Sequence, residues 1–103
     1  MTEVRDAPQA VDLRKPRSEV RFIDSTDQVV GMLADLRLGS GALAVDAERA
    51  SGFRYSQAAF LLQLHRRGSA IYLIDPQSTF TDEASRFNLA AFMTEMPWIL
   101  HAS

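Results

Sequence analysis

Residues 43–48 read LAVDAE, an apolar run that ends in two acidic residues. Successive side chains of a β-strand alternate between its faces, so Asp46 and Glu48 are predicted to share one face and to be partly buried. Residues i and i+2 of a strand lie about 6.6 Å apart. Two carboxylates this close beside apolar neighbours repel each other, and a divalent cation such as Mg²⁺ would relieve the repulsion. The alternative is a strand end at which both acids are simply hydrated.

Other short apolar segments alternate with helical patterns along the chain. Extended segments are predicted at 20–23, 42–48, 58–66, 70–74 and 98–100. A turn at 66–69 joins two of them, and Asp75-Pro76 ends the next. The last segment is expected to run parallel to an earlier strand through a helical crossover. The predicted fold class is therefore α/β, a mixed sheet with flanking helices.

Two amphipathic helices are expected between these strands. The first is predicted to begin among the candidate N-caps at 24–27 and to end at Gly39, and its apolar stripe consists of Val29, Val30, Met32, Leu33 and Leu36. The second is predicted to begin near Asp82 and to be stopped by Pro97, and its apolar side consists of Phe87, Leu89, Ala91, Phe92 and Met96. These positions, together with Trp98, are expected to pack in the core.

Composition excludes several classes of protein. The chain has 103 residues and a formal net charge of −2, so no overall positive field attracts nucleic acid. It has no cysteine, and this absence rules out disulfide frameworks and thiolate metal sites. No apolar run approaches the ~20 residues of a membrane span, and no segment resembles a signal peptide. We therefore expect a cytoplasmic protein without membrane contact. Residues 1–18 contain two prolines and mixed charges without periodicity, which predicts a flexible tail ahead of a domain over 19–103.

Longer stretches of the sequence resemble a known family. Residues 43–57, LAVDAERASGFRYSQ, resemble the first exonuclease motif of ribonuclease D, particularly that of its actinobacterial members. Residues 61–64 (LLQL) and 71–76 (IYLIDP) look like the next two strands of that family's exonuclease domain, and 98–103 (WILHAS) resemble the approach to its second motif. The resemblance covers residues 20–103. It implies the N-terminal part of a ribonuclease H-like 3′-5′ exonuclease domain, incomplete because the chain stops before the second and third motifs.

The same resemblance implies a mechanism. The family belongs to the DEDD class, in which four acids hold two Mg²⁺ or Mn²⁺ ions about 3.5–4 Å apart and a phosphodiester is hydrolysed at the 3′ end of RNA, such as a transfer RNA precursor. Asp46 matches the first acid, expected to bridge both ions. Glu48 matches the second, expected to bind one ion and to orient the attacking water. The third and fourth acids would follow residue 103, so the chain alone is expected to be inactive.

Weaker candidates surround this pair. Ala47, Gln57 and His101 are predicted substrate-binding residues by position. His65 is expected to be structural or at the surface, and neither histidine has a ligand partner at a spacing that indicates zinc. The alternative functions are a related exonuclease acting on DNA and a non-catalytic nucleic-acid-binding or interaction module. A module of the latter kind would use its uncovered sheet and apolar last strand. The sequence leaves the oligomeric state open.

Overall fold

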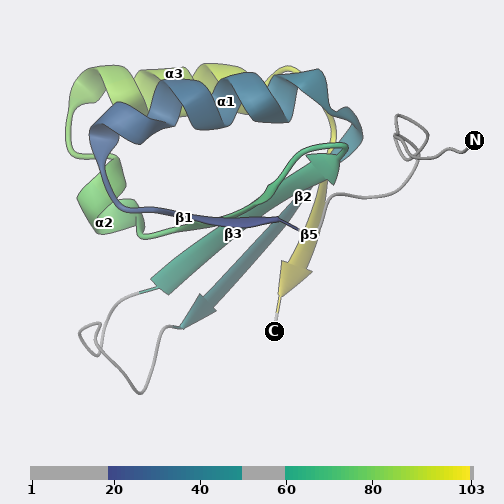
Figure 1. The fold of residues 1–103 in the computed structure, drawn as a ribbon, viewed down its shortest axis with the longest axis horizontal. Coiled ribbons are helices and arrows are strands. Elements are labelled where there is room, and N and C mark those ends of the chain that lie inside the picture. The colour runs from purple at the N-terminus through teal and green to yellow at the C-terminus, as the bar shows by residue number, and fades with distance from the viewer. Residues whose placement is uncertain (1–18, 50–59, 103) are drawn as a thin grey trace, which may run out of the picture.

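Five strands and the helices between them make up most of residues 19–49 and 60–102, which are the parts of the chain that the computed structural model describes. In chain order the elements are β1 (Val20–Ile23), the 3₁₀ helix η2 (Thr26–Gln28), α1 (Val29–Leu38), β2 (Ser40–Arg49), β3 (Phe60–Arg67), β4 (Ile71–Ile74), α2 (Pro76–Thr79), α3 (Glu83–Met93) and β5 (Trp98–Ala102) (Figure 1). The predictions for residues 1–18 and for Gln57 lie outside the described residues.

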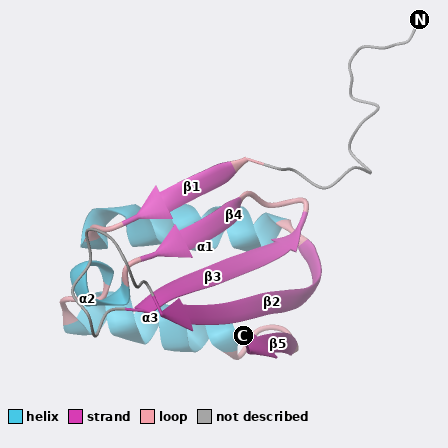
Figure 2. Ribbon diagram, turned by 90° about the horizontal axis from the view of Figure 1, so that it is seen from below, coloured by secondary structure: helices cyan, strands magenta, loops and turns pink. Residues whose placement is uncertain are grey.

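The five strands form one mixed sheet in the order β1-β4-β3-β2-β5. β1 runs parallel to β4, β5 runs parallel to β2, and β3 is antiparallel to both of its neighbours. Helices α1 and α3 lie side by side on one face of this sheet (Figures 1 and 2). The α/β class, the mixed sheet and the parallel last strand are confirmed. Within the described residues, the opposite face has no helical cover, and no helix is long and apolar enough to cross a membrane.

The hydrophobic core lies between the sheet and the two helices. Strand residues Leu43, Leu64, Tyr72 and Ile74 are at most 1% exposed and meet the helical side chains of Val29, Met32, Leu33, Leu36 and Phe92. Leu64 is buried whereas its neighbours Gln63 and His65 are half-buried, as alternation along a strand requires. The period-2 pattern of β2 and β3 therefore predicts their faces correctly.

Three residues predicted in the core are exposed instead. Val30 and Phe87 are each 70% exposed, and Trp98 is 49% exposed. Only one stripe of each helix contacts the sheet in this two-layer arrangement, and Val30 and Phe87 lie outside that stripe. Trp98 lies on β5, the last strand in the sheet order, where α3 covers it only in part.

The boundaries of the helices also differ from prediction. The predicted start of the first helix is nevertheless confirmed: Ser25 is the N-cap of the 3₁₀ turn that leads into α1, and its amide donates to Gln28 Oε1 at 3.0 Å. Gly39 is the C-cap of α1, also as predicted. α3 ends at Met93, before the predicted stop at Pro97, and Asp82 caps its other end by accepting from the amide of Ser85 at 2.8 Å. The short helix α2 was not predicted; Asp75, which follows β4, caps it by accepting from the amide of Gln77 at 3.1 Å.

A polar network crosses the helix–sheet interface. Asp35 on α1 accepts two hydrogen bonds at Oδ2, from the Tyr72 hydroxyl at 2.7 Å and from the amide of Ala70 at 3.0 Å. Arg21 on β1 donates to the Tyr72 hydroxyl at 3.3 Å. Tyr72 is 1% exposed, so its hydroxyl depends on these partners. The network joins α1 to β1 and β4.

This network predicts alkaline sensitivity. Burial, and then the hydrogen bond to Asp35, raises the pKa of Tyr72 from 10.0 to about 12. Because the folded state holds the proton more tightly, this stabilisation is present below pH 10 and is lost as the pH rises from 10 to 12. The free energy of unfolding should fall by roughly 3 kcal/mol across that range. Urea unfolding at pH 8 to 12 should show this loss in the native chain and not in Tyr72→Phe. An equal loss in both would contradict the assignment.

Candidate functional site

The two acids of the LAVDAE run lie near the end of β2, between β3 and β5. Asp46 pairs with Gln63 on β3 and with His101 on β5, and Glu48 pairs with Leu61. Directly paired residues of adjacent strands point to the same face. Asp46 and Glu48 therefore share one face, as predicted, and it is the face without helical cover among the described residues.

The two acids differ in burial. Asp46 is half-buried, whereas Glu48 is exposed and not partly buried as predicted. β5 lies beside Asp46 through His101, and its pairing with β2 is described as far as Ala102 beside Ala47. Glu48 is paired with Leu61 of β3 among the described residues. It can reach solvent and any ligand that approaches the end of the sheet.

An irregularity at the start of β2 fixes which side chains face the open side. The register between β2 and β3 shifts between Ser40 and Ala44, and Gly41 there has a φ of +79°, in the left-handed region that favours glycine. The guanidinium of Arg66 donates to the carbonyl of Gly41 from Nε at 3.0 Å and from Nη2 at 2.8 Å. A slip of one residue would reverse both faces, so this bulge sets the position of Asp46.

β5 is joined to β2 just below the site. The amide of Leu43 donates to the carbonyl of Pro97 at 2.8 Å, and the parallel register then runs from Trp98 beside Leu43 to His101 beside Asp46. His101 is exposed. The structure thus brings together two predicted site residues that are 55 positions apart in the chain.

The other two predicted substrate contacts are not placed in this way. Ala47 lies between the acids, and by alternation its side chain is on the opposite face, so its backbone alone is next to the site. Gln57 lies outside the described residues. Gln63 and His65 do lie on the face of Asp46, although the sequence pointed to neither as a site residue. The sequence pattern predicts that Gln63 and His65 share one face of β3, but it does not predict that β2 is the strand beside them.

Two buried polar atoms on this face have no hydrogen-bond partner among the described residues: Asp46 Oδ1 and His65 Nε2. Nearly all buried polar atoms are paired, and leaving one unpaired costs roughly 1–3 kcal/mol. Such atoms are explained most simply by an ion, water or ligand that satisfies them.

The residues present fit part of a divalent metal site. Asp46 and Glu48 offer the carboxylate oxygens that Mg²⁺ and Mn²⁺ accept, and the inaccessible Oδ1 is an acceptor in need of a cation or donor. Within residues 19–49 and 60–102, no three side chains of Asp, Glu, His or Cys converge closely enough to enclose an ion. Water and substrate oxygens would have to complete its coordination.

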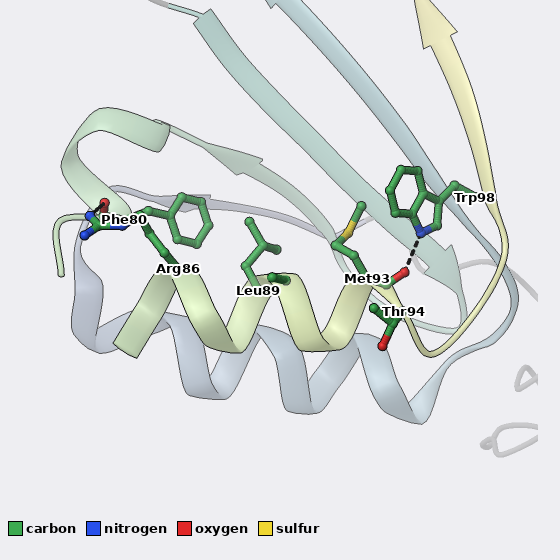
Figure 3. A pocket seen from close by; sticks show the side chains of 7 residues that line it. Phe80, Arg86, Leu89, Met93, Thr94 and Trp98 are labelled. Atoms are coloured by element: carbon green, nitrogen blue, oxygen red, sulfur yellow. Dashed lines mark hydrogen bonds between the residues drawn. The ribbon is translucent and has the colours of Figure 1, made fainter. Parts of the chain in front are cut away.

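An apolar groove lies on the other face of β5. It has a volume of about 550 Å³ and runs along α3, with Leu89, Met93 and Trp98 projecting into it (Figure 3). The indole Nε1 of Trp98 donates to the carbonyl of Met93 at 2.7 Å, and Arg86 donates to the carbonyl of Phe80 at 3.1 Å. Trp98 pairs with the core residue Leu43, which places this groove on the face opposite Asp46. Its lining is mostly apolar and suits an apolar segment.

Comparisons with known proteins show a similarity in structure and do not identify a family. No protein-family model and no curated protein matches the sequence. The chain is similar to a protein from Bifidobacterium adolescentis of known crystal structure, with 33% sequence identity and a TM-score of 0.56. The similarity covers 82% of this chain and 23% of the Bifidobacterium adolescentis protein, so this chain spans less than a quarter of that protein's length.

Proposed function

We propose that this chain supplies the first two acids of a ribonuclease H-like 3′-5′ exonuclease domain of the ribonuclease D type. The domain would hydrolyse phosphodiester bonds at the 3′ ends of RNA in the cytoplasm. One observation carries the proposal: Asp46 and Glu48 share the open face of β2, and Asp46 Oδ1 is buried with no partner among the described residues. Two carboxylates on the same open face of one strand are suited to holding the metal ions of two-metal hydrolysis.

Each residue has a distinct role in this proposal. Asp46 would hold the ions, and Glu48, exposed at the strand end, would hold one of them and accept a hydrogen bond from the attacking water. When bound, Mg²⁺ or Mn²⁺ supplies activation of that water and stabilisation of the leaving oxygen. His101 would contact the substrate beside Asp46. Its exposure and register support that role.

The topology and the partial coverage support the same proposal. A mixed sheet with an antiparallel hairpin and a parallel last strand is compatible with the ribonuclease H-like class. The similar Bifidobacterium adolescentis protein is more than four times as long as the region matched in it. We therefore expect the remaining acids and the RNA-binding surface to lie outside residues 1–103.

The test compares the 103-residue chain with a chimera in which it replaces the matched region of the Bifidobacterium adolescentis protein. Mg²⁺ held by two carboxylates binds weakly, so the isolated chain should release no measurable nucleotide from 3′-labelled RNA. The unmodified Bifidobacterium adolescentis protein, as the reference, and the chimera should both release mononucleotides, and EDTA should stop both. Release by the isolated chain, or an active reference with a folded but inactive chimera, would contradict the proposal.

The choice of RNA over DNA is tested with the same chimera. Matched RNA and DNA strands with identical 3′ sequences should be degraded at different rates, with RNA faster. Faster degradation of DNA would favour the related DNA-directed exonuclease instead.

A specific observation favours a second candidate, an interaction module. β5 is the last strand in the sheet order, carries no Asp, Glu, Lys or Arg, and exposes Trp98, Ile99 and Leu100 at 49%, 52% and 68%. Edge strands of stable monomers usually carry charges or proline that discourage pairing with another chain. An edge this apolar is suited to contact with a further polypeptide segment.

This edge predicts association of the isolated chain. Sedimentation velocity should show a concentration-dependent increase in mass, because strand pairing and apolar contact can both occur at β5. Leu100→Lys should shift the chain toward the monomer by adding a charge to the edge. Leu38→Lys is the matched control, since Leu38 is 87% exposed on α1, outside β5, and should leave the association unchanged. A monomer at every concentration would argue against the module.

A further inference from the structure

We infer that His65 is a nitrogen ligand of the site: its Nε2 and Asp46 Oδ1 bind the same divalent cation, which makes the site bind Mn²⁺ more tightly than Mg²⁺. The inference rests on the proposed function and adds to it a ligand and a metal preference. It begins from the two buried polar atoms, one on each of two adjacent strands, that have no partner among the described residues.

The sheet register places the two side chains as neighbours. Asp46 pairs with Gln63 and His65 pairs with Ala44, so Asp46 and His65 occupy diagonal positions on β2 and β3. Diagonal neighbours in an antiparallel pair are roughly 7–8 Å apart, within reach of long side chains such as an imidazole. Both are on the face without helical cover among the described residues.

The chemistry of the two atoms favours a shared cation. Asp46 Oδ1 is an acceptor, and Nε2 of a neutral imidazole offers a lone pair when the proton is on Nδ1. Neither atom reaches solvent, and neither has a hydrogen-bond partner in the described parts of the chain. One cation between them would satisfy both lone pairs at once.

The second histidine of the chain provides a comparison. His101 is directly opposite Asp46, closer in register than His65. His101 is exposed, however, so water can satisfy its ring nitrogens without an ion. Burial, and not register, distinguishes His65.

A nitrogen ligand has a predictable effect on metal preference. Mg²⁺ prefers oxygen ligands and keeps its water, whereas first-row transition metals accept imidazole nitrogen. An ion held by carboxylate oxygen alone would discriminate little between Mg²⁺ and Mn²⁺. With His65 beside Asp46, Mn²⁺ gains a ligand that Mg²⁺ uses poorly.

The test measures metal binding by the complete 103-residue chain, without any activity assay. Mn²⁺ binding is followed by the loss of the free-ion electron paramagnetic resonance signal, and Mg²⁺ binding by competition. His65→Phe should weaken Mn²⁺ binding about tenfold or more, as loss of a metal partner does, and change Mg²⁺ binding by about twofold or less. His101→Phe, the matched control, should change neither.

Two further measurements separate the possible outcomes. In Asp46→Asn, adding His65→Phe should cause no further loss of Mn²⁺ binding, because residues that share one ion are not additive. On the native chain, Mn²⁺ should broaden the ¹⁵N ring signals of His65 before those of His101, a readout that does not depend on the variants folding.

The outcomes keep the two proposals distinct. Mn²⁺ binding that depends on Asp46 and not on His65 would overturn this inference and leave the proposed function standing. A loss of Mn²⁺ binding in His101→Phe and not in His65→Phe would also overturn it, as would broadening of the His101 ring signals before those of His65. Either result would place the nitrogen ligand on β5. No binding of Mn²⁺ by the native chain at millimolar concentration would overturn this inference, whereas the proposed function is decided by the chimera.

Discussion

Asp46→Asn in the chimera is expected to lower EDTA-sensitive release of nucleotides from RNA by at least about a thousandfold, equivalent to about 4 kcal/mol of transition-state stabilisation. Asparagine keeps the shape of the side chain and removes the charge that would hold the ions. The side chain is half-buried beside Gln63 and His101, so a same-sized replacement fits the sheet. The rate of release from 3′-labelled RNA measures the effect.

The fold should survive this substitution. Asp46 Oδ1 has no hydrogen-bond partner among the described residues, so removing the charge breaks no known contact, and the free energy of unfolding should change by less than about 1 kcal/mol. Asp24→Asn is the control, because Asp24 is exposed and follows β1 at the opposite edge of the sheet. It should keep full activity. Normal turnover in Asp46→Asn would show that the acids are not the metal site.

The sequence predicted the site only as far as local alternation reaches. A period of two places Asp46 and Glu48 on one face, and the structure agrees. Alternation does not say which face the helices cover or where a neighbouring strand ends. The position of His101 beside Asp46 depends on the pairing of β5 with β2, and the position of His65 depends on a register set by the bulge at Gly41. Both are properties of strand pairing between distant segments.

The helices show a similar limit. Helical spacing correctly identifies Val29, Leu33, Leu36 and Phe92 as buried, and it includes Val30 and Phe87, which are exposed. In a two-layer fold each helix packs one stripe against one sheet face, so a residue at the border of a broad apolar side can lie in solvent. Which border residue is buried depends on how the helix is rotated on the sheet. Residues on one helix do not determine that rotation.

Two phenylalanines of α3 therefore make a matched test of the packing. Phe92 is fully buried among the core residues, with the Arg37 guanidinium carbon 5.4 Å from its ring centroid, whereas Phe87 is 70% exposed. Phe92→Ala is expected to lower the free energy of unfolding by about 3–5 kcal/mol, because it leaves a cavity between α3 and the sheet. Phe87→Ala removes the same atoms from a solvated position and should change it by less than about 0.5 kcal/mol.

Urea unfolding followed by circular dichroism measures both variants at a concentration where the chain is monomeric. A loss of 3–5 kcal/mol approaches the whole stability of a small domain, so Phe92→Ala is expected to be largely unfolded without denaturant. Phe92→Leu keeps the comparison quantitative, since it retains most of the buried volume and should remain folded with a smaller loss. Equal losses in Phe87→Ala and Phe92→Ala would mean that α3 is rotated on the sheet, with both rings buried as the sequence periodicity alone predicts.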